Sequence, residues 1–327
     1  SFNITYADKE GNIGEIYNAK MPKRVEGVDW SKHLPGDTSE LIWDQYLSTD
    51  ELPQIWNPSC GWLFSANSTP FKITDPKCNN NRSDFSKTMG IEERFTNRAR
   101  RSLALFSPDP IISESDLLKY RSDTFYDAKS ELMNLVRILI NIESENPIVI
   151  EAQKVLKEWD GDTKKENRGA ALAVITGMRS LGYEYIKKDQ DPLEMLIKTA
   201  KELKSRYGRI DPEWGKINRI QRGNYDLPLD GAPDILRAIY ADRDGISKSG
   251  VMNAFAGDTH IMYADWNSEG VLDLKSIHQY GSATIDDTST HYDDQVEMFT
   301  AGKYKNMPMY LEDVLKVKTR DYRPGKG

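Results

Sequence analysis

Two hairpin-like patterns, one near each end of the chain, bracket a long stretch with helical periodicity. Apolar and polar residues alternate over residues 2–17 around a turn at 8–12, and strand-forming runs return over 260–277 around a turn at 267–270. Alternation with a period of two is typical of an antiparallel pair with one buried face. The order of strands, helical insert and strands predicts an α+β fold, with antiparallel sheet strands at both ends.

Helical patterns occupy the region between these hairpins. A helix is predicted over residues 92–106, where a Ser-Pro pair ends it, and a Ser-x-x-Asp cap at 113 begins another helix that runs through Tyr120. Further helices are expected over residues 148–159, 170–185, 192–207 and 311–317. We expect the central helices to carry no catalytic residue and to form a cover packed on the sheet.

The composition excludes two classes of function. With 327 residues, of which 38% are hydrophobic and 29% charged, the chain can bury a sizeable core. Its net charge of −7 is spread over scattered charges of both signs without a basic block, so nucleic acid is not an expected partner. No uninterrupted apolar run approaches the ~20 residues of a membrane-spanning helix, so no membrane span is expected.

Residues 57–71 hold the first candidate for function. Asn-Pro and Gly61 set a tight entry, the apolar run 62–64 predicts a strand, and the Asn-Ser-Thr-Pro phrase that begins at Asn67 ends it. At the end of a strand, the uncharged amide of Asn67 is able to donate a hydrogen bond to a carbonyl oxygen that develops negative charge. The alternative is that Asn67 only caps its own turn, as asparagine often does.

Several phrases resemble one known family. Residues 50–58 (Asp-Glu-Leu-Pro-Gln-Ile-Trp-Asn-Pro) and 61–70, which contain Gly-Trp and Asn-Ser-Thr-Pro, are similar to the penicillin acylase family, including its acyl-homoserine-lactone and aculeacin acylase branch. Other matching phrases are residues 3–13, 278–282 and 289–295, and two that are closer to the acyl-homoserine-lactone acylase branch, 214–220 and 227–238. The resemblance, which spans Asn3 to about Tyr310, implies the C-terminal part of the β chain of an αββα N-terminal-nucleophile hydrolase.

The resemblance implies two kinds of site residue. In the family, the Asn that opens the Asn-x-(Ser/Thr)-Pro phrase supplies an oxyanion-hole amide, and that position is Asn67 here. An Arg beyond it holds this Asn and the nucleophile's terminus in place. Arg98 fits an Arg-x-x-Arg-Ser-Leu phrase and is slightly preferred, while Arg94 fits an Arg-x-Thr phrase of more distant members. Arg94, Arg98 and Arg101 recur at i, i+4 and i+7, so we expect them on one face of a helix. The alternative to a role in the site is that this arginine row is simply a solvated helix face.

The cysteines and the oxygen-rich loops leave alternatives open. Cys60 and Cys78 lie 18 positions apart, which suits either a disulfide in an oxidising compartment or two unrelated buried thiols. Residues 75–84 are rich in oxygen ligands but match no strict calcium loop. A second polar group consists of His278, His291, Asp293 and Asp294. Its spacing does not match that of metal ligands, so hydrogen bonding within loops is the preferred interpretation. No cofactor is expected: the resemblance leaves a structural calcium ion near residues 75–84 as an alternative, but the spacing does not support it and a solvated loop is the preferred interpretation.

The implied reaction is hydrolysis of an amide by acyl transfer. The family's nucleophile is a serine freed at the N-terminus of the β chain, whose own α-amino group acts as its base. Ser1 is not expected to be that serine, because the family's serine is followed by Asn and a long sheet segment, whereas Phe2 and the hairpin follow here. The nucleophile, the second oxyanion donor and most of the acyl pocket are expected upstream, so this chain alone is expected to be inactive.

The resemblance also implies substrates, partners and a location. The substrate is an N-acyl compound such as an acyl-homoserine lactone, a penicillin or a lipopeptide, and the protein partners are the α chain and the N-terminal part of the β chain of the same precursor. The implied location is periplasmic or secreted, in a bacterium. A signal peptide is then expected upstream, because residues 1–6 lack a positive start and an apolar core.

Three segments are expected in one compact unit: 1–92 with sheet and the oxyanion Asn, 93–245 with helices, and 246–327 with strands returning to the sheet.

Residues 21–53 have no sustained period and predict a long irregular connection, held in place by Trp30, Trp43 and Trp56. An alternative function follows from these aromatic residues. The chain would then be a stand-alone, non-catalytic binding module of an exported protein, with residues 21–56 as its binding surface.

Overall fold

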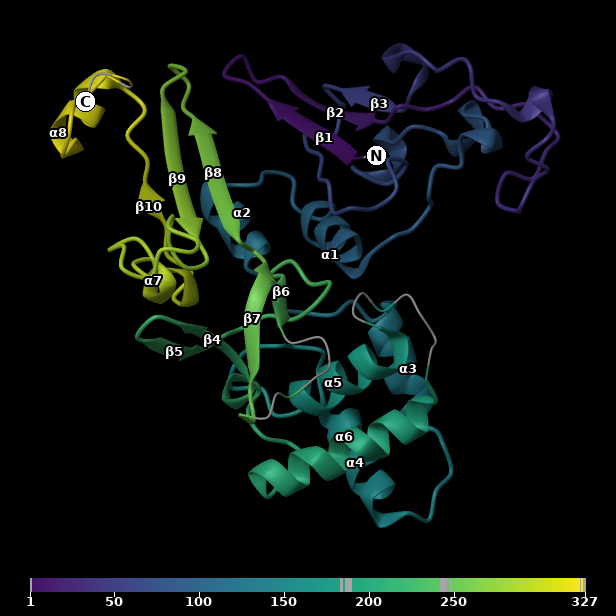
Figure 1. Ribbon diagram of the computed structural model, residues 1–327, viewed down its shortest axis with the longest axis vertical. Helices are drawn as coiled ribbons and strands as arrows, with labels where there is room; N and C mark the ends of the chain where they lie inside the picture. Colours follow the sequence, from purple (N-terminus) through teal and green to yellow (C-terminus); the bar gives the residue numbers. More distant parts are fainter. Residues whose placement is uncertain are drawn as a thin grey trace.

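The computed structural model describes residues 2–182, 185, 190–241, 246, 249–323 and 325. Ser1, and with it the prediction about its role, lies outside the described residues. The N-terminal sheet and the C-terminal hairpin lie at one end of the elongated molecule, and a group of helices forms the other end (Figure 1). The first described strand and the last described helix are therefore remote from the helical end.

The first sheet matches the predicted N-terminal hairpin. Its strands, in spatial order, are β1 (Phe2–Ala7), β2 (Ile13–Asn18) and β3 (Gln54–Trp56), all antiparallel. In the turn between β1 and β2, the Asp8 side chain accepts hydrogen bonds from the backbone N–H groups of Glu10 and Asn12. The hairpin prediction over residues 2–17 is confirmed, with the turn chemistry that an aspartate in this position supplies.

Residues 21–53 form the long irregular connection that the sequence predicts, with short 3-10 turns and no strand within this range. The rings of Trp30 and Trp43 pack with their centroids 6.0 Å apart, and the Arg24 guanidinium carbon lies 4.9 Å from the Trp43 centroid. Trp56 packs on β1 instead. These three tryptophan rings therefore pack against other side chains of the same chain, in agreement with the prediction that they hold this connection in place.

The helices are α1 (Asn97–Phe106), α2 (Glu114–Arg121), α3 (Glu131–Ile140), α4 (Pro147–Glu158), α5 (Ala170–Leu181), α6 (Pro192–Tyr207), α7 (Val296–Thr300) and α8 (Leu311–Val317). The predicted helices that correspond to α2, α4, α6 and α8 are confirmed. The prediction over 170–185 is too long, because Gly182 follows the last turn of α5 with φ of 74°. Within the described residues, no helix combines the length and the apolar character needed to cross a membrane.

Helix α5 is the centre of the largest hydrophobic core. Every residue of α5 except Arg179 is buried, and α3, α4 and α6 pack around it. A Cβ atom at Gly177 would lie 2.3 Å from Leu132 Cδ1, so α3 approaches α5 closely only because this residue is glycine. The central helices therefore enclose a core of their own, joined by Ile217 and Met252, rather than forming only a cover on the sheet.

Two further sheets follow the helices. The strands β4 (Asn218–Arg222), β5 (Tyr225–Pro228), β6 (Ile239–Ala241) and β7 (Met252–Gly257) are ordered β5-β4-β7-β6, and β8 (His260–Trp266), β9 (Leu272–His278) and β10 (Lys305–Asn306) are ordered β10-β9-β8. The antiparallel pairing of β8 with β9 confirms the hairpin predicted over 260–277. In the described part of the chain, this hairpin belongs to a sheet separate from that of β1 to β3, which differs from the expected return to one sheet. The α+β class with antiparallel sheets at both ends is confirmed.

Cys60 and Cys78 form a disulfide bond with a Cα–Cα distance of 6.4 Å, which decides between the two alternatives for the cysteines. The cross-linked end is also held by hydrogen bonds, since the side-chain oxygen of Asn79 accepts from the backbone N–H groups of Ile73 and Thr74. The disulfide thus closes the base of the loop that contains residues 61–70.

Replacing both cysteines with alanine is expected to lower the free energy of unfolding by about 3 kcal/mol, because the cross-link removes conformational entropy from the unfolded chain. Denaturant unfolding of the double variant against the oxidised wild-type protein measures this loss. Wild-type protein kept under reducing conditions is the control and should match the variant. An unchanged midpoint in both would contradict the prediction.

Candidate active site

The stretch that carries Asn67 is an irregular loop, so the strand predicted over residues 62–64 is wrong. Its extended part makes an isolated backbone hydrogen bond, from the Phe64 N–H to the Ile73 carbonyl, instead of a ladder. Both aromatic rings of the predicted strand pack on Phe106 of α1. The apolar run therefore serves packing on a helix, which a short hydrophobic pattern does not distinguish from a strand.

Asn67 lies in this loop with a left-handed backbone, at φ of 51°. Asparagine is one of the few residues other than glycine that adopt this conformation readily. The next residues are tied to other segments: the Ser68 carbonyl accepts from the Asn3 side chain at 3.0 Å, and the Thr69 N–H donates to the Arg94 carbonyl at 2.9 Å. The exposed side chain of Asn67 is thus presented from a backbone whose next two residues are held by two other segments.

Helix α1 begins at Asn97, later than the sequence predicts. Thr96 is the N-cap, since its side chain accepts a hydrogen bond from the backbone N–H three residues further on. Arg94 therefore precedes the helix, and the expected helix face shared by Arg94, Arg98 and Arg101 is not formed. Arg98 lies in the first turn of α1, while Arg94 lies in the irregular segment before it.

Arg98 fixes the orientation of the Asn67 amide. Its Nη2 donates to Asn67 Oδ1 at 3.1 Å. A guanidinium has only donors, so the amide must present its oxygen to Arg98 and direct its NH2 group elsewhere. Among the described residues, that NH2 group has no hydrogen-bond partner and the Asn67 side chain caps no turn. The arrangement leaves a neutral donor available at a fixed place.

Asp234 completes this group, although the sequence analysis did not single it out. Its Oδ2 accepts from the backbone N–H of Asn97 at 2.9 Å, and its Oδ1 lies 3.5 Å from Arg98 Nε. Burial raises the pKa of the Asp234 carboxyl, while the Asn97 N–H and the charges of Arg98 and Arg94 act in the opposite direction. The sequence signal here is only the Gly-Ala-Pro-Asp phrase within the family-like residues 227–238, which carries no role by itself.

Two cavities reach Asn67 and Arg94. One, of about 540 Å³, is also lined by Arg98 and Asp234 and by the aromatic side chains of Tyr240 and Phe255. The other, of about 380 Å³, is also lined by Phe2, Asn3, Tyr17 and Glu92. The structure therefore brings together all three residues that the sequence analysis proposes, from the loop, the segment before α1 and α1 itself. Arg94 borders both cavities, and Arg98 borders the first.

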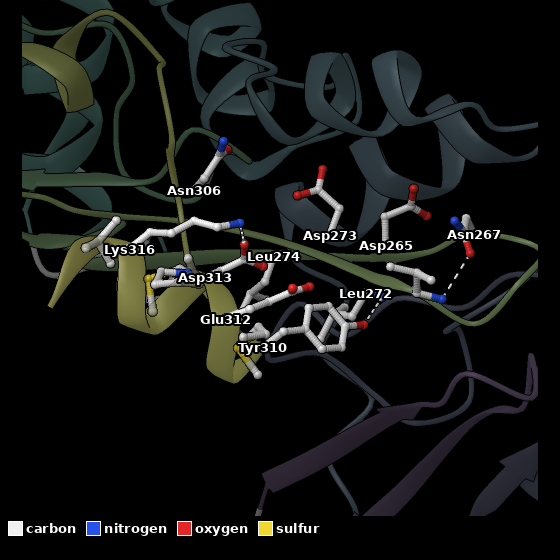
Figure 2. A pocket seen from close by; sticks show the side chains of 15 residues that line it. Asp265, Asn267, Leu272, Asp273, Leu274, Asn306, Tyr310, Glu312, Asp313 and Lys316 are labelled. Atoms are coloured by element: carbon white, nitrogen blue, oxygen red, sulfur yellow. Dashed lines mark hydrogen bonds and ion pairs between the residues drawn. The ribbon is translucent and has the colours of Figure 1, made fainter.

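A larger groove of about 750 Å³ lies along the C-terminal hairpin, between β9, β10 and α8 (Figure 2). Its polar lining is mainly acidic, with Asp265, Asp273, Glu312 and Asp313, and Lys316 donates to Asp313 at 2.8 Å. The described residues that line it include no serine, threonine, cysteine, histidine or arginine. Because the groove lacks these side chains and its lysine, Lys316, is paired with Asp313, the candidate site lies at Asn67 and not at this groove.

Of the second polar group, His291, Asp293 and Asp294 are engaged in loop hydrogen bonds, whereas His278 is the last residue of β9. His291 Nδ1 lies 2.9 Å from Asp294 Oδ2, and Asp293 Oδ2 accepts from the Asn224 N–H at 3.3 Å. Burial and the neighbouring His260 lower the pKa of His278. No three His, Cys, Asp or Glu side chains gather as a possible metal site within the described ranges.

Comparisons with known proteins agree on one family. The family model described as penicillin amidase matches residues 1–316. The chain is 33% identical over 72 residues to penicillin G acylase of Escherichia coli, a match that covers 22% of this chain and 8% of that protein. The match thus spans a small part of that relative's length. A thermostable penicillin G acylase from Alcaligenes faecalis superposes with a TM-score of 0.57 at 15% identity, covering 98% of this chain and 67% of that chain, and shows the shared fold.

Asn97→Ala is expected to lower the free energy of unfolding by about 2–4 kcal/mol, because it leaves buried backbone groups without partners. Asn97 Nδ2 donates to the Asp234 carbonyl at 2.7 Å, and its Oδ1 accepts from the Asp127 N–H at 2.7 Å. Asn141→Ala is the control, since Asn141 is exposed and donates to the Arg137 carbonyl of its own helix. Denaturant unfolding compares them, and equal losses in the two variants count against the prediction.

Proposed function

This chain belongs to the penicillin amidase family, and from this premise we propose that it is the part of an amide hydrolase that holds the oxyanion. The observation that carries the proposal is the Asn67 amide, whose NH2 group is unpaired among the described residues and whose oxygen is held by Arg98. Stabilisation of a developing oxyanion requires a hydrogen-bond donor that does not ionise and whose orientation is fixed.

In the proposed reaction, a serine hydroxyl from elsewhere in the same precursor attacks the acyl carbonyl of the substrate. Negative charge forms on the carbonyl oxygen, and Asn67 Nδ2–H donates to it together with a second, backbone donor from upstream. The amine leaves with a proton, and water then releases the acyl group from the serine. Arg98 and Arg94 hold the oxyanion side of the site without taking part in proton transfer.

The proposed substrate is an N-acyl compound such as an acyl-homoserine lactone, a penicillin or a lipopeptide. The phrases at residues 214–220 and 227–238 favour the acyl-homoserine-lactone acylase branch, for which quorum quenching is the corresponding activity. The cavity beside Asn67 supports a substrate of mixed character, because it joins two arginines to the aromatic rings of Tyr240 and Phe255.

We propose the α chain and the N-terminal part of the β chain of the same precursor as the protein partners. They would contribute the nucleophile, the second oxyanion donor and most of the acyl pocket. A periplasmic or secreted location is proposed as well, and the Cys60–Cys78 disulfide supports it, since such bonds persist in oxidising compartments.

The chain alone is expected not to hydrolyse amides, because no serine in its described part matches the family's nucleophile phrase. Incubation with a panel of acyl-homoserine lactones and phenylacetyl amides, followed by detection of the free amine, measures this. The full-length precursor after maturation is the positive control. Turnover by the chain alone that disappears in Ser1→Ala would refute the proposed division of the site.

In the full-length protein, Asn67→Ala is expected to lower kcat by roughly 10² to 10³ with little change in KM, as the loss of one oxyanion donor does. Arg98→Ala should also lower kcat. The double variant should lose less than the product of the two single effects, because both residues act on one oxyanion.

Arg94→Ala separates the two candidate arginines. A loss of kcat in Arg94→Ala that is absent in Arg98→Ala would assign the orienting role to Arg94. If Asn67→Ala retains kcat within a few-fold of the wild-type value while remaining folded, the proposed oxyanion site is wrong.

A further inference from the structure

The loop that carries Asp234 connects β5 with β6 and reaches the start of α1. Asp234 has a left-handed backbone, at φ of 56°, although it is not glycine. Hydrogen bonds from two other segments hold it there: the Tyr126 hydroxyl donates to the Pro233 carbonyl at 2.6 Å, and Asn97 Nδ2 donates to the Asp234 carbonyl at 2.7 Å. A conformation of this kind persists only where the surroundings determine it, and such positions concentrate at functional sites.

The two carboxylate oxygens of Asp234 have different neighbours. Oδ2 accepts from the Asn97 N–H at the first turn of α1. Oδ1 faces Arg98 Nε at 3.5 Å, and both atoms are buried without a hydrogen-bond partner among the described residues. Asp234 itself is only 8% exposed. These two buried charged atoms therefore compensate each other, and the charge of Arg94 also acts on the Asp234 carboxyl.

Arg98 links this carboxylate to the candidate oxyanion residue. Its Nε edge faces Asp234, and its Nη2 donates to Asn67 Oδ1. Because the guanidinium is planar and its donors form a rigid fork, an anchor on one edge determines where the other edge points. The direction of the Asn67 NH2 group thus depends on Asp234 through one intervening side chain.

We propose that Asp234 is a positioning residue for the oxyanion site: its Oδ1 holds Arg98, and Arg98 sets the orientation of the Asn67 amide. This inference rests on the proposed function, in which Asn67 holds the oxyanion. Asp234 touches neither substrate nor the reacting atoms in this role. It acts on the transition state only through the geometry of Arg98 and Asn67.

A purely structural role for Asp234 makes a different demand on its side chain. An acidic residue that only stabilises the start of α1 needs one acceptor, the oxygen that faces the Asn97 N–H. The positioning role needs two acceptors, one for Asn97 and one for Arg98. Asp234→Asn separates the roles, because an amide keeps one acceptor oxygen, turns a donor toward the other neighbour, and tolerates the left-handed backbone.

The experiment measures Asp234→Asn in the mature full-length protein. We expect kcat to fall roughly 10- to 100-fold, as a small misplacement of a group around the reacting atoms does, with KM within about twofold. In an Arg98→Ala background, the same substitution should change kcat by less than about twofold, because the link through Arg98 is already absent. A crystal structure of Asp234→Asn should show Arg98 and the Asn67 amide displaced from their wild-type positions.

Asp123→Asn is the matched control. Asp123 forms a bidentate ion pair with Arg101, also on α1, with contacts of 2.9 and 2.6 Å, and its side chain is 9% exposed. The loss of this pair is expected to lower the melting temperature without lowering kcat. If both aspartate variants lower kcat in proportion to their loss of thermal stability, Asp234 has only a structural role.

The outcomes separate this inference from the proposed function. An unchanged kcat in Asp234→Asn, or a full additional loss in the Arg98→Ala background, overturns the positioning role even if Asn67→Ala is inactive. If Asn67→Ala is fully active, the proposed function fails. The Asp234→Asn crystal structure then tests the positioning contact independently: displaced Arg98 and Asn67 side chains support it, and unmoved side chains overturn it.

Discussion

The guanidinium of Arg98 is the contact on which the candidate site depends. It lies between the amide of Asn67 and the carboxylate of Asp234, which belong to two irregular loops. A loop by itself does not hold an amide to the precision that an oxyanion site requires, because its own backbone hydrogen bonds are few. The Arg98 guanidinium supplies that precision because Arg98 lies on the first turn of a capped helix. The Thr96 cap and the Asn97 contacts fix where α1 begins.

The same arrangement explains why two residues keep an unfavourable backbone. Asn67 and Asp234 both adopt positive φ, a conformation that costs on the order of 1–3 kcal/mol for most residues. Asparagine and aspartate lower that cost, and hydrogen bonds from β1, from the segment before α1 and from Tyr126 oppose relaxation. Tyr126 belongs to the large core around α5, so the helical end of the molecule helps to hold the Asp234 loop.

The electrostatics of the site follow from burial on one side and exposure on the other. Asp234 is buried and its pKa is raised, whereas the Asn67 side chain is exposed at the cavity. The charged pair of Asp234 and Arg98 lines the same cavity as the amide, with the Arg98 side chain 22% exposed and the Asp234 side chain 11% exposed. The neutral donor and the guanidinium that orients it therefore share the cavity, and the low exposure of the Asp234 carboxylate strengthens its attraction to Arg98.

The sequence by itself determined the parts of this protein that depend on local pattern. The 2–17 and 260–277 hairpins, the helices that became α2, α4 and α6, and the family-like phrase at Asn67 follow from periodicity, caps and motif. Tertiary structure decided the rest. The 62–64 run packs on α1 instead of pairing, and α1 begins at its Thr96 cap, which separates Arg94 from Arg98. Asp234 joins Asn97 across 137 residues, and no local signal encodes such a contact, because it arises only when separate loops are brought to the same helix end.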